Sequence, residues 1–140
     1  MEKYYTPKID EVTLGRFEHE IKVNDKWNVS DHIPADTNPA ITNAYIETKG
    51  LRVKYLDYED IESLGFKYAH KYNGNAVFYK EFDDPRKIHT EIELIYNEVS
   101  KWCIISQGDF EAGFEETTRF TGTIKNINEL RALLIQLGVD

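Results

Sequence analysis

The only thiol in this 140-residue sequence belongs to Cys103. A reactive cysteine needs a positively charged and partly open environment that lowers the pKa of its thiol. Cys103 lies between Trp102 and Ile104 on a predicted strand, and Lys101 is the only basic residue near it in the sequence. The pattern therefore favours a buried, inert cysteine over a catalytic nucleophile. A single cysteine also excludes an intramolecular disulfide.

Three side chains of types that bind divalent metals, His89, Glu91 and Glu93, alternate along another predicted strand and so project from one face. Successive positions on one face of a strand are about 7 Å apart, which is too far for all three to reach one ion. At most two could bind it, with ligands from elsewhere in the fold. We therefore predict a solvated polar face, no metal site and no cofactor.

Glycine motifs that hold phosphate groups are absent from the sequence. Gly108 and Gly113 flank an acidic loop, and neither belongs to a GxGxxG or Walker pattern. The sequence also has no nucleophile elbow, no HExxH and no paired CxxC. We therefore predict no catalytic residues and expect the protein not to be an enzyme.

The loop between Gly108 and Thr117 combines four acids and two phenylalanines with no basic residue. Its candidate partner-binding residues are Asp109, Phe110, Glu111, Phe114, Glu115 and Glu116. Aromatic residues on an acidic loop can anchor a partner protein while the carboxylates contact the partner's basic rim. The alternative is a solvated loop whose phenylalanines pack onto the core of its own domain.

Asn73-Gly74 predicts a tight hairpin turn, because both residues tolerate a positive φ. The pairs that this turn produces are Tyr72 with Asn75, Tyr68 with Tyr79, and Lys67 with Lys80. One face of the hairpin would then carry Phe66, Tyr68, His70, Tyr72, Val77 and Tyr79, and the other Lys67, Lys71, Phe78 and Lys80. Lysines interleaved with aromatics can bind single-stranded nucleic acid. Here they fall mostly on opposite faces, as in a hairpin with one buried face, so nucleic-acid binding is disfavoured.

The formal net charge is −8, from 17 basic and 25 acidic residues. Such a charge repels nucleic acid and anionic membranes unless the basic residues gather on one face. It steers the protein towards a protein partner with a basic surface. The sequence begins with no signal segment, and no apolar run approaches the roughly 20 residues that cross a bilayer. We expect a cytoplasmic protein that does not bind membranes, and the oligomeric state is left open.

Alternation of polar and apolar residues predicts strands over most of the chain. The positions predicted to face inward are Phe17, Ile21 and Val23 in residues 12–23, Leu51, Val53 and Tyr55 further on, and Ile88, Ile92, Leu94 and Tyr96 in residues 88–96. Residues 30–43, with two prolines and two aspartates, predict a long loop. The length and the 41% of hydrophobic residues fit a single domain, 1–140.

Two helices are predicted, one near 57–64 and one at 127–137. Asp57 can cap the first and Gly65 can end it. Asn126 or Asn128 can cap the second, and Gly138 can end it. The apolar stripe of the second helix consists of Leu130, Leu133, Leu134 and Leu137. We therefore predict an α+β fold, an antiparallel sheet of about five to seven strands with the C-terminal helix packed on one face.

Two groups of segments carry a resemblance to a family. They are residues 51–57 (LRVKYLD) with 59–66 (EDIESLGF), and residues 120–126 (FTGTIKN) with Glu129-Leu130 and the terminal Leu-Gly. In these segments, about a quarter of the chain, the sequence resembles small uncharacterised proteins of Bacteroidetes phages and mobile elements. The shared motifs are a cap, a turn and a leucine stripe, so no functional residues carry over. The resemblance implies expression inside a bacterial cell during infection, in the host cytoplasm.

These features together favour a small acidic non-enzymatic binding protein. In a phage setting this would be an inhibitor of a host defence protein, anti-CRISPR-like, which competes with nucleic acid at a basic surface. The alternative is a virion or assembly accessory protein that forms a homo-oligomer. A metal-dependent hydrolase that uses the strand with His89, Glu91 and Glu93 ranks third.

Overall fold

The structure of the protein is a computed structural model, and it describes residues 2–8, 19–30, 46–47, 49–83, 89–108 and 117–139. Contacts within the chain divide it into two compact units, Met1–Tyr55 and Leu56–Asp140. Each unit has an antiparallel sheet of its own. The α+β class and the antiparallel pairing are therefore confirmed, with the strands divided between two sheets. The single domain inferred from chain length stays a prediction.

The first unit holds a four-stranded sheet in the order β1-β4-β2-β3. Its strands are β1 (Tyr4–Tyr5), β2 (His19–Val23), β3 (Lys26–Ser30) and β4 (Leu51–Lys54). Asn24 and Asp25 form the turn between β2 and β3, and both adopt positive φ. Leu51 and Val53 are buried, as their alternation predicted. Val23, predicted to face inward, is instead 46% exposed because it ends β2 beside the turn.

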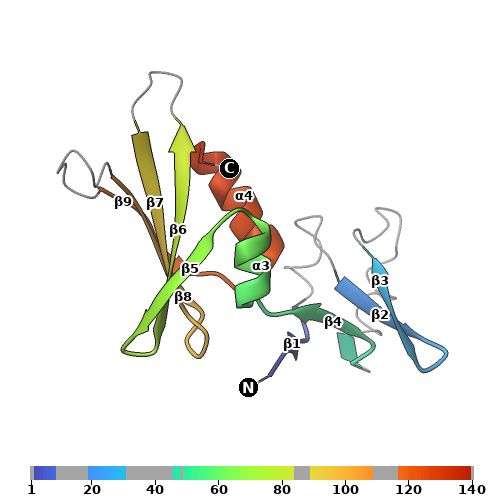
Figure 1. The fold of residues 1–140 in the computed structure, drawn as a ribbon. Helices are drawn as coiled ribbons and strands as arrows, with labels where there is room; N and C mark the ends of the chain where they lie inside the picture. Colours follow the sequence, from blue (N-terminus) through green and yellow to red (C-terminus); the bar gives the residue numbers. More distant parts are fainter. Residues whose placement is uncertain are drawn as a thin grey trace. The chain divides into compact units, whose positions relative to one another are not determined.

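The second unit holds a five-stranded sheet in which each strand pairs with the next along the chain. Its strands are β5 (Lys67–Tyr72), β6 (Asn75–Asp83), β7 (His89–Asn97), β8 (Trp102–Gly108) and β9 (Thr117–Thr123). Two helices accompany them, α3 (Tyr58–Ser63) and α4 (Ile127–Leu137). Figure 1 shows both helices on the same side of this sheet. Among the described elements of the unit, none covers the other side.

The core of the second unit lies between its sheet and its two helices. Ile92, Leu94 and Tyr96 of β7 have no exposed surface, which confirms the inward positions predicted for them. Leu130 and Leu134 of α4 pack into the same cluster, and each contributes about 1.5–3 kcal/mol by burial. The leucine stripe therefore fixes which face of α4 contacts the sheet.

Both helices begin at the residues that the sequence marks as caps. The Asp57 side chain accepts a hydrogen bond from the Asp60 backbone, and the Asp60 side chain accepts one from the Asp57 backbone. For α4 the cap is Asn126 and not Asn128, because the Asn126 side chain accepts from the Glu129 backbone at 2.9 Å. These local bonds satisfy N–H groups that an uncapped helix leaves without partners.

The helices also end where glycines were predicted to stop them. Gly138 is the C-cap of α4 with φ of 73°, and Gly65, directly after the C-cap of α3, has φ of 96°. Glycine adopts such left-handed conformations at no steric cost.

The first hairpin of the second unit corrects part of the predicted register. Its turn is at Asn73-Gly74, and Tyr72 pairs with Asn75 as predicted. A bulge between Tyr68 and His70 then shifts the pairing by one residue. The pairs beyond the bulge are Tyr68 with Phe78 and Lys67 with Tyr79.

This shift moves Tyr68 to the face of Phe78 and Lys67 to the face of Tyr79, and of the two hairpin faces the one with Phe78 is the buried one. Phe78 was predicted on the solvent face and is instead fully buried against the helices, with Tyr68 beside it. His70 and Val77 lie on the opposite face, and Lys67 joins them there. The prediction that the aromatic face of the hairpin is the buried one was therefore wrong for His70, Tyr72 and Tyr79.

Several sequence predictions lie outside the described residues. They are the strand over 12–18, the loop over 31–43, Ile88, and the acidic loop over 109–116. In the part of the chain that the structure describes, no helix is long and apolar enough to cross a membrane.

Candidate functional site

The residues predicted to bind a partner are not among those that the structure describes. Asp109, Phe110, Glu111, Phe114, Glu115 and Glu116 all lie in the gap between Gly108 and Thr117. The structure does fix the two strands that flank this segment, because β8 ends at Gly108 and β9 begins at Thr117. The two strands pair antiparallel through Gln107 and Thr117, so the loop connects the ends of adjacent strands.

Cys103 is a buried strand residue, as predicted. It has no exposed surface and packs in the core of the second unit. Burial raises the pKa of its thiol from 9.0 to about 12. At neutral pH the side chain is therefore a protonated thiol in an apolar environment, which is inert as a nucleophile.

Burial also raises the pKa of two tyrosines in the second unit. Tyr96 donates a hydrogen bond to the Leu56 carbonyl at 3.2 Å, and desolvation is the main cause of its raised pKa. Desolvation and a hydrogen bond with Glu98 raise the pKa of Tyr58. Both phenols connect elements of one core, so they serve the fold rather than acid–base chemistry.

Glu91 and Glu93, two of the three residues weighed as metal ligands, lie on the side of the sheet away from the helices. Glu93 accepts a hydrogen bond from the Tyr79 hydroxyl at 2.9 Å across the β6–β7 pair. The side chain of His89 is not described. Within the described residues, no three histidine, cysteine or acidic side chains are grouped so that they could hold a metal ion.

A cluster that the sequence did not suggest surrounds Arg52 in the first unit. The guanidinium of Arg52 lies 3.8 Å from the ring centre of Tyr4 and 4.0 Å from that of Trp27. Its Nε donates to the Glu20 carboxylate at 2.7 Å. One planar cation thus contacts residues from β1, β2 and β3 while its own strand, β4, lies among them.

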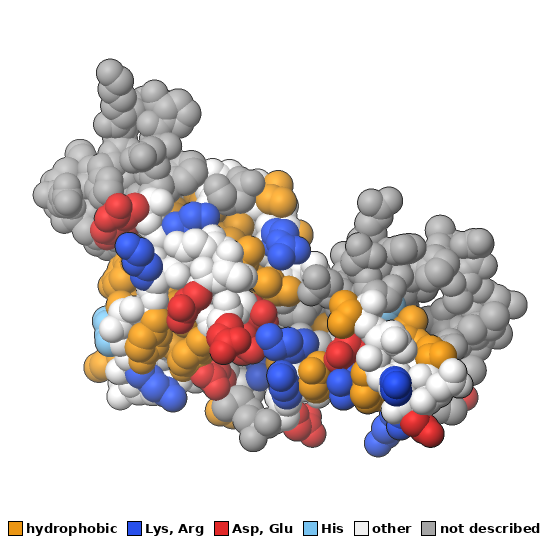
Figure 2. All heavy atoms as spheres, turned by 45° about the vertical axis from the view of Figure 1, so that its right-hand side comes forward, with side chains coloured by type: hydrophobic (Ala, Val, Ile, Leu, Met, Phe, Trp, Pro, Cys, Tyr) orange, Lys and Arg blue, Asp and Glu red, His pale blue; other side chains and the backbone are white. Residues whose placement is uncertain are grey.

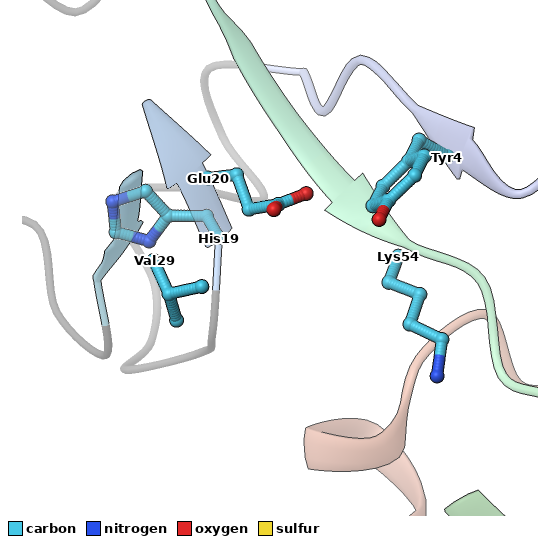
Figure 3. Close-up of a pocket in the computed structure, with 5 residues that line it drawn as sticks. All are labelled: Tyr4, His19, Glu20, Val29 and Lys54. Atoms are coloured by element: carbon cyan, nitrogen blue, oxygen red, sulfur yellow. The ribbon is translucent and has the colours of Figure 1, made fainter. Parts of the chain in front are cut away.

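A pocket of about 230 Å³ lies next to this cluster, lined by Tyr4, His19, Glu20, Val29 and Lys54. Figure 3 shows that Glu20 and Tyr4 point towards one another. The His19 ring points away from both, and the Lys54 ammonium ends far from the Glu20 carboxylate. Glu20 is already bonded to Arg52. The polar groups therefore do not converge on one point, as catalysis would require.

A second pocket, also of about 230 Å³, lies at the end of β5, β6 and β7 that is farthest from the Asn73-Gly74 turn. Its lining consists of Gly65, Lys67, Tyr79, Lys80, Glu81 and Glu91. The Lys80 ammonium donates to the Leu64 carbonyl at 3.0 Å, next to the end of α3. This lysine completes the hydrogen bonds of a helix end, which is a structural role.

Charge is divided unequally between the two units. Residues 56–140 contain 16 acidic and nine basic residues, a net −7, whereas residues 1–55 contain nine acidic and eight basic residues. In Figure 2 acidic and basic side chains alternate with apolar ones over the face that is turned to the viewer. The second unit therefore carries nearly all of the acidic excess of the sequence.

The side of the β5–β9 sheet that faces away from α3 and α4, here called the open face, presents rows of cross-strand neighbours. The row nearest the two hairpin tips consists of Tyr72, Asn75, Asn97, Trp102 and Thr123. The next row consists of His70, Val77, Ile95, Ile104 and Thr121. The third consists of Lys67, Tyr79, Glu93, Ser106 and Thr118, and beyond it lie Glu81 and Glu91.

Sequence reasoning missed both of these arrangements for identifiable reasons. The Arg52 cluster joins four strands that are separated in the chain, so no linear motif marks it. The hairpin residues of the first two rows were predicted on one shared face, but as its buried face, and the bulge altered only the third row, where Lys67 and not Tyr68 pairs with Tyr79. The alternation of Trp102 and Ile104 with the buried Cys103 and Ile105 was a usable signal for this face.

Comparison with known proteins adds no assignment. No protein-family model, curated protein or solved structure matches this chain.

Proposed function

We propose that this chain is a small acidic, non-enzymatic binding protein that acts by surface contact with a protein partner bearing a basic surface. The observation that carries the proposal is the concentration of the acidic excess, −7 of −8, in one unit. A unit with that charge attracts basic surfaces and accelerates association with them. Lys80 and Glu20, which line the two pockets, are bonded to the Leu64 carbonyl and to Arg52, and the Cys103 thiol is buried, which supports a function through the surface.

The specific form of the proposal is an inhibitor of a host defence protein that competes with nucleic acid for a basic channel. It follows from the phage setting that the sequence resemblance implies. An acidic protein that occupies such a channel excludes the phosphate backbone from the same positive charges. The acidic loop over 109–116 supplies four of the carboxylates that would meet the channel.

The test is a competition experiment with a guide-loaded CRISPR effector from a Bacteroidetes host and its fluorescent DNA target. The unmodified protein should displace the DNA, and the triple variant E111K/E115K/E116K should displace it roughly tenfold less well, about 1.4 kcal/mol. The matched control is E2K/E47K/E62K, which makes the same change in net charge at three exposed glutamates elsewhere. Equal losses in both variants would reject the loop as the contact, and no displacement at all would reject the inhibitor.

A homo-oligomeric assembly protein remains the alternative function. Sedimentation velocity separates the two, because an assembly subunit forms a symmetric oligomer at micromolar concentration and an inhibitor of this kind acts as a monomer.

A further inference from the structure

The first two rows of the open face contain no lysine, arginine, aspartate or glutamate. Ten side chains from five strands make up these rows, in a chain where charged residues account for 30% of the sequence. The centres of protein interfaces are depleted in charged residues and enriched in tyrosine and tryptophan. A charge-free area on so acidic a unit is therefore a candidate interface centre.

Two exposed aromatic residues stand on either side of this area. Tyr72 on β5 is 66% exposed and Trp102 on β8 is 45% exposed. Ile95 and Ile104 lie between them in the second row and are half-buried. Aromatic anchors beside an aliphatic centre are the arrangement that most often supplies binding energy at interfaces.

The amide groups of the first row are held in place between the two aromatics. Asn97 donates to the Asn75 side chain at 3.0 Å and accepts from the backbone N–H groups of Val99 and Ser100. The β7–β8 turn and the row are thus fixed to one another. A rigid surface loses little conformational entropy on binding.

Negative charge predominates at the other end of the same face, where three glutamates outnumber Lys67, which lines a pocket with two of them. Glu81 and Glu91 are direct cross-strand neighbours, and Glu93 follows two residues after Glu91 on β7. Like charges at opposed positions destabilise a sheet, so this arrangement has a cost in the isolated protein. A cation supplied by a partner would relieve the repulsion.

The area of the open face indicates which kind of partner it can bind. Five strands span about 19 Å, and three rows extend about 14 Å along them, an area on the order of 300 Å². A stable interface needs about 800 Å² on each partner, and two copies would also bring together two units of net −7. A single helix lying along the strands needs no more than this area, and α4 covers the opposite face in that way.

We propose that the open face binds an amphipathic helix of a partner protein, with aliphatic residues over Ile95 and Ile104 and lysine or arginine residues over Glu81, Glu91 and Glu93. Tyr72 and Trp102 flank the helix at the end nearest the hairpin tips. This inference rests on the proposed binding function and names the contact face and the chemistry of the partner.

The probe is a synthetic amphipathic helix of leucine and lysine, about 18 residues and about 27 Å long. Its affinity for the intact chain is measured by isothermal titration calorimetry. Trp102→Ser and, separately, Tyr72→Ser should each weaken binding roughly tenfold. Ile135→Ser, at a residue of α4 that is 57% exposed on the other side of the unit, should leave the affinity unchanged.

The charged end of the face is tested with Glu91→Lys and a peptide in which glutamate replaces lysine. Glu91→Lys should weaken the binding of the lysine peptide and strengthen the binding of the glutamate peptide. The proposal would be overturned if Trp102→Ser and Ile135→Ser changed the affinity for the peptide equally. Equal affinity of the unmodified chain for both peptides would also overturn it. A dimer that Trp102→Ser dissociates would overturn it too, because a second copy would then occupy the face.

This experiment separates the inference from the proposed function. Displacement of nucleic acid by the unmodified protein without any effect of Trp102→Ser would reject the open face and keep the binding function. Site-specific peptide binding without displacement of nucleic acid would keep the open face and reject the inhibitor.

Discussion

At the scale of single residues, the ionisable groups of the second core are kept in their neutral forms. Burial raises the pKa of Cys103 to about 12 and raises the pKa values of Tyr96 and Tyr58 above the usual tyrosine value of 10.0. A group whose pKa is higher in the folded state keeps its proton there at a pH at which the unfolded chain has lost it. The stability that these groups provide is therefore complete below pH 9 and declines above it.

We predict that the free energy of unfolding of the second unit falls between about pH 9 and pH 12, where the unfolded thiol and phenols ionise first. Each group contributes at most about 1.4 kcal/mol per pH unit. Urea unfolding followed by Trp102 fluorescence, with Trp27 replaced by phenylalanine, measures the decline. Cys103→Ala should remove the part of the decline in unfolding free energy that begins near pH 9. An unfolding free energy that stays constant from pH 8 to 11 would contradict the burial of these groups.

In the first unit, where fewer side chains are buried, the side chain of Arg52 joins the strands to one another. Its guanidinium stacks between Tyr4 and Trp27 and also bonds to Glu20. The side chains of Arg52 and Glu20 are 25% and 20% exposed, so the ion pair is partly shielded from water. A planar cation is required for contact with two rings at once, and lysine does not provide one.

We predict that Arg52→Lys destabilises the first unit by about 1–2 kcal/mol, through loss of two cation–π contacts. Unfolding followed by Trp27 fluorescence, with Trp102 replaced by phenylalanine, reports this change. Lys22→Ala, at an exposed position of β2, serves as the control and should change stability little. Equal stability of the lysine variant and the unmodified chain would mean that the stack contributes nothing.

At the scale of helices and strands, features encoded within a few residues could be predicted from the sequence. Asp57, Asn126 and Gly138 act at the helix ends where their types predicted them, and Asn73-Gly74 forms its turn. Each depends on local backbone chemistry. The bulge after Tyr68 could not be predicted in this way, because it is set by the packing of that ring against Tyr58 and Phe78.

We predict that Tyr68→Ser destabilises the second unit by about 1–3 kcal/mol. The bulge places the Tyr68 ring on the helix side of the sheet, and the substitution removes its two aromatic contacts, each worth about 0.5–1.5 kcal/mol. Ala69→Ser, at the exposed extra residue of the bulge, should be nearly neutral. Urea unfolding of the two variants compares them. Equal stability of the two variants would show that the bulge has no packing role.

At the scale of the whole molecule, the two units differ in charge and in how they are held together. The first is nearly neutral and is joined by the Arg52 cluster, whereas the second is strongly acidic around an apolar core. Net charge and fold class could be predicted from composition and alternation. The open face could not, because its rows combine residues from five strands whose registers are fixed only by the complete sheet.

The proposed function depends on contact through the exterior of the protein, and the open face is the surface proposed for that contact. Amide chemical shifts of the nitrogen-15-labelled chain, recorded during titration with the leucine–lysine helix, test that claim residue by residue. Saturable shifts should concentrate at Asn75, Asn97, Ile104 and Glu93, with little change at the exposed residues of α4. Shifts that concentrate on α3 and α4, or that spread evenly over all acidic positions, would contradict the account.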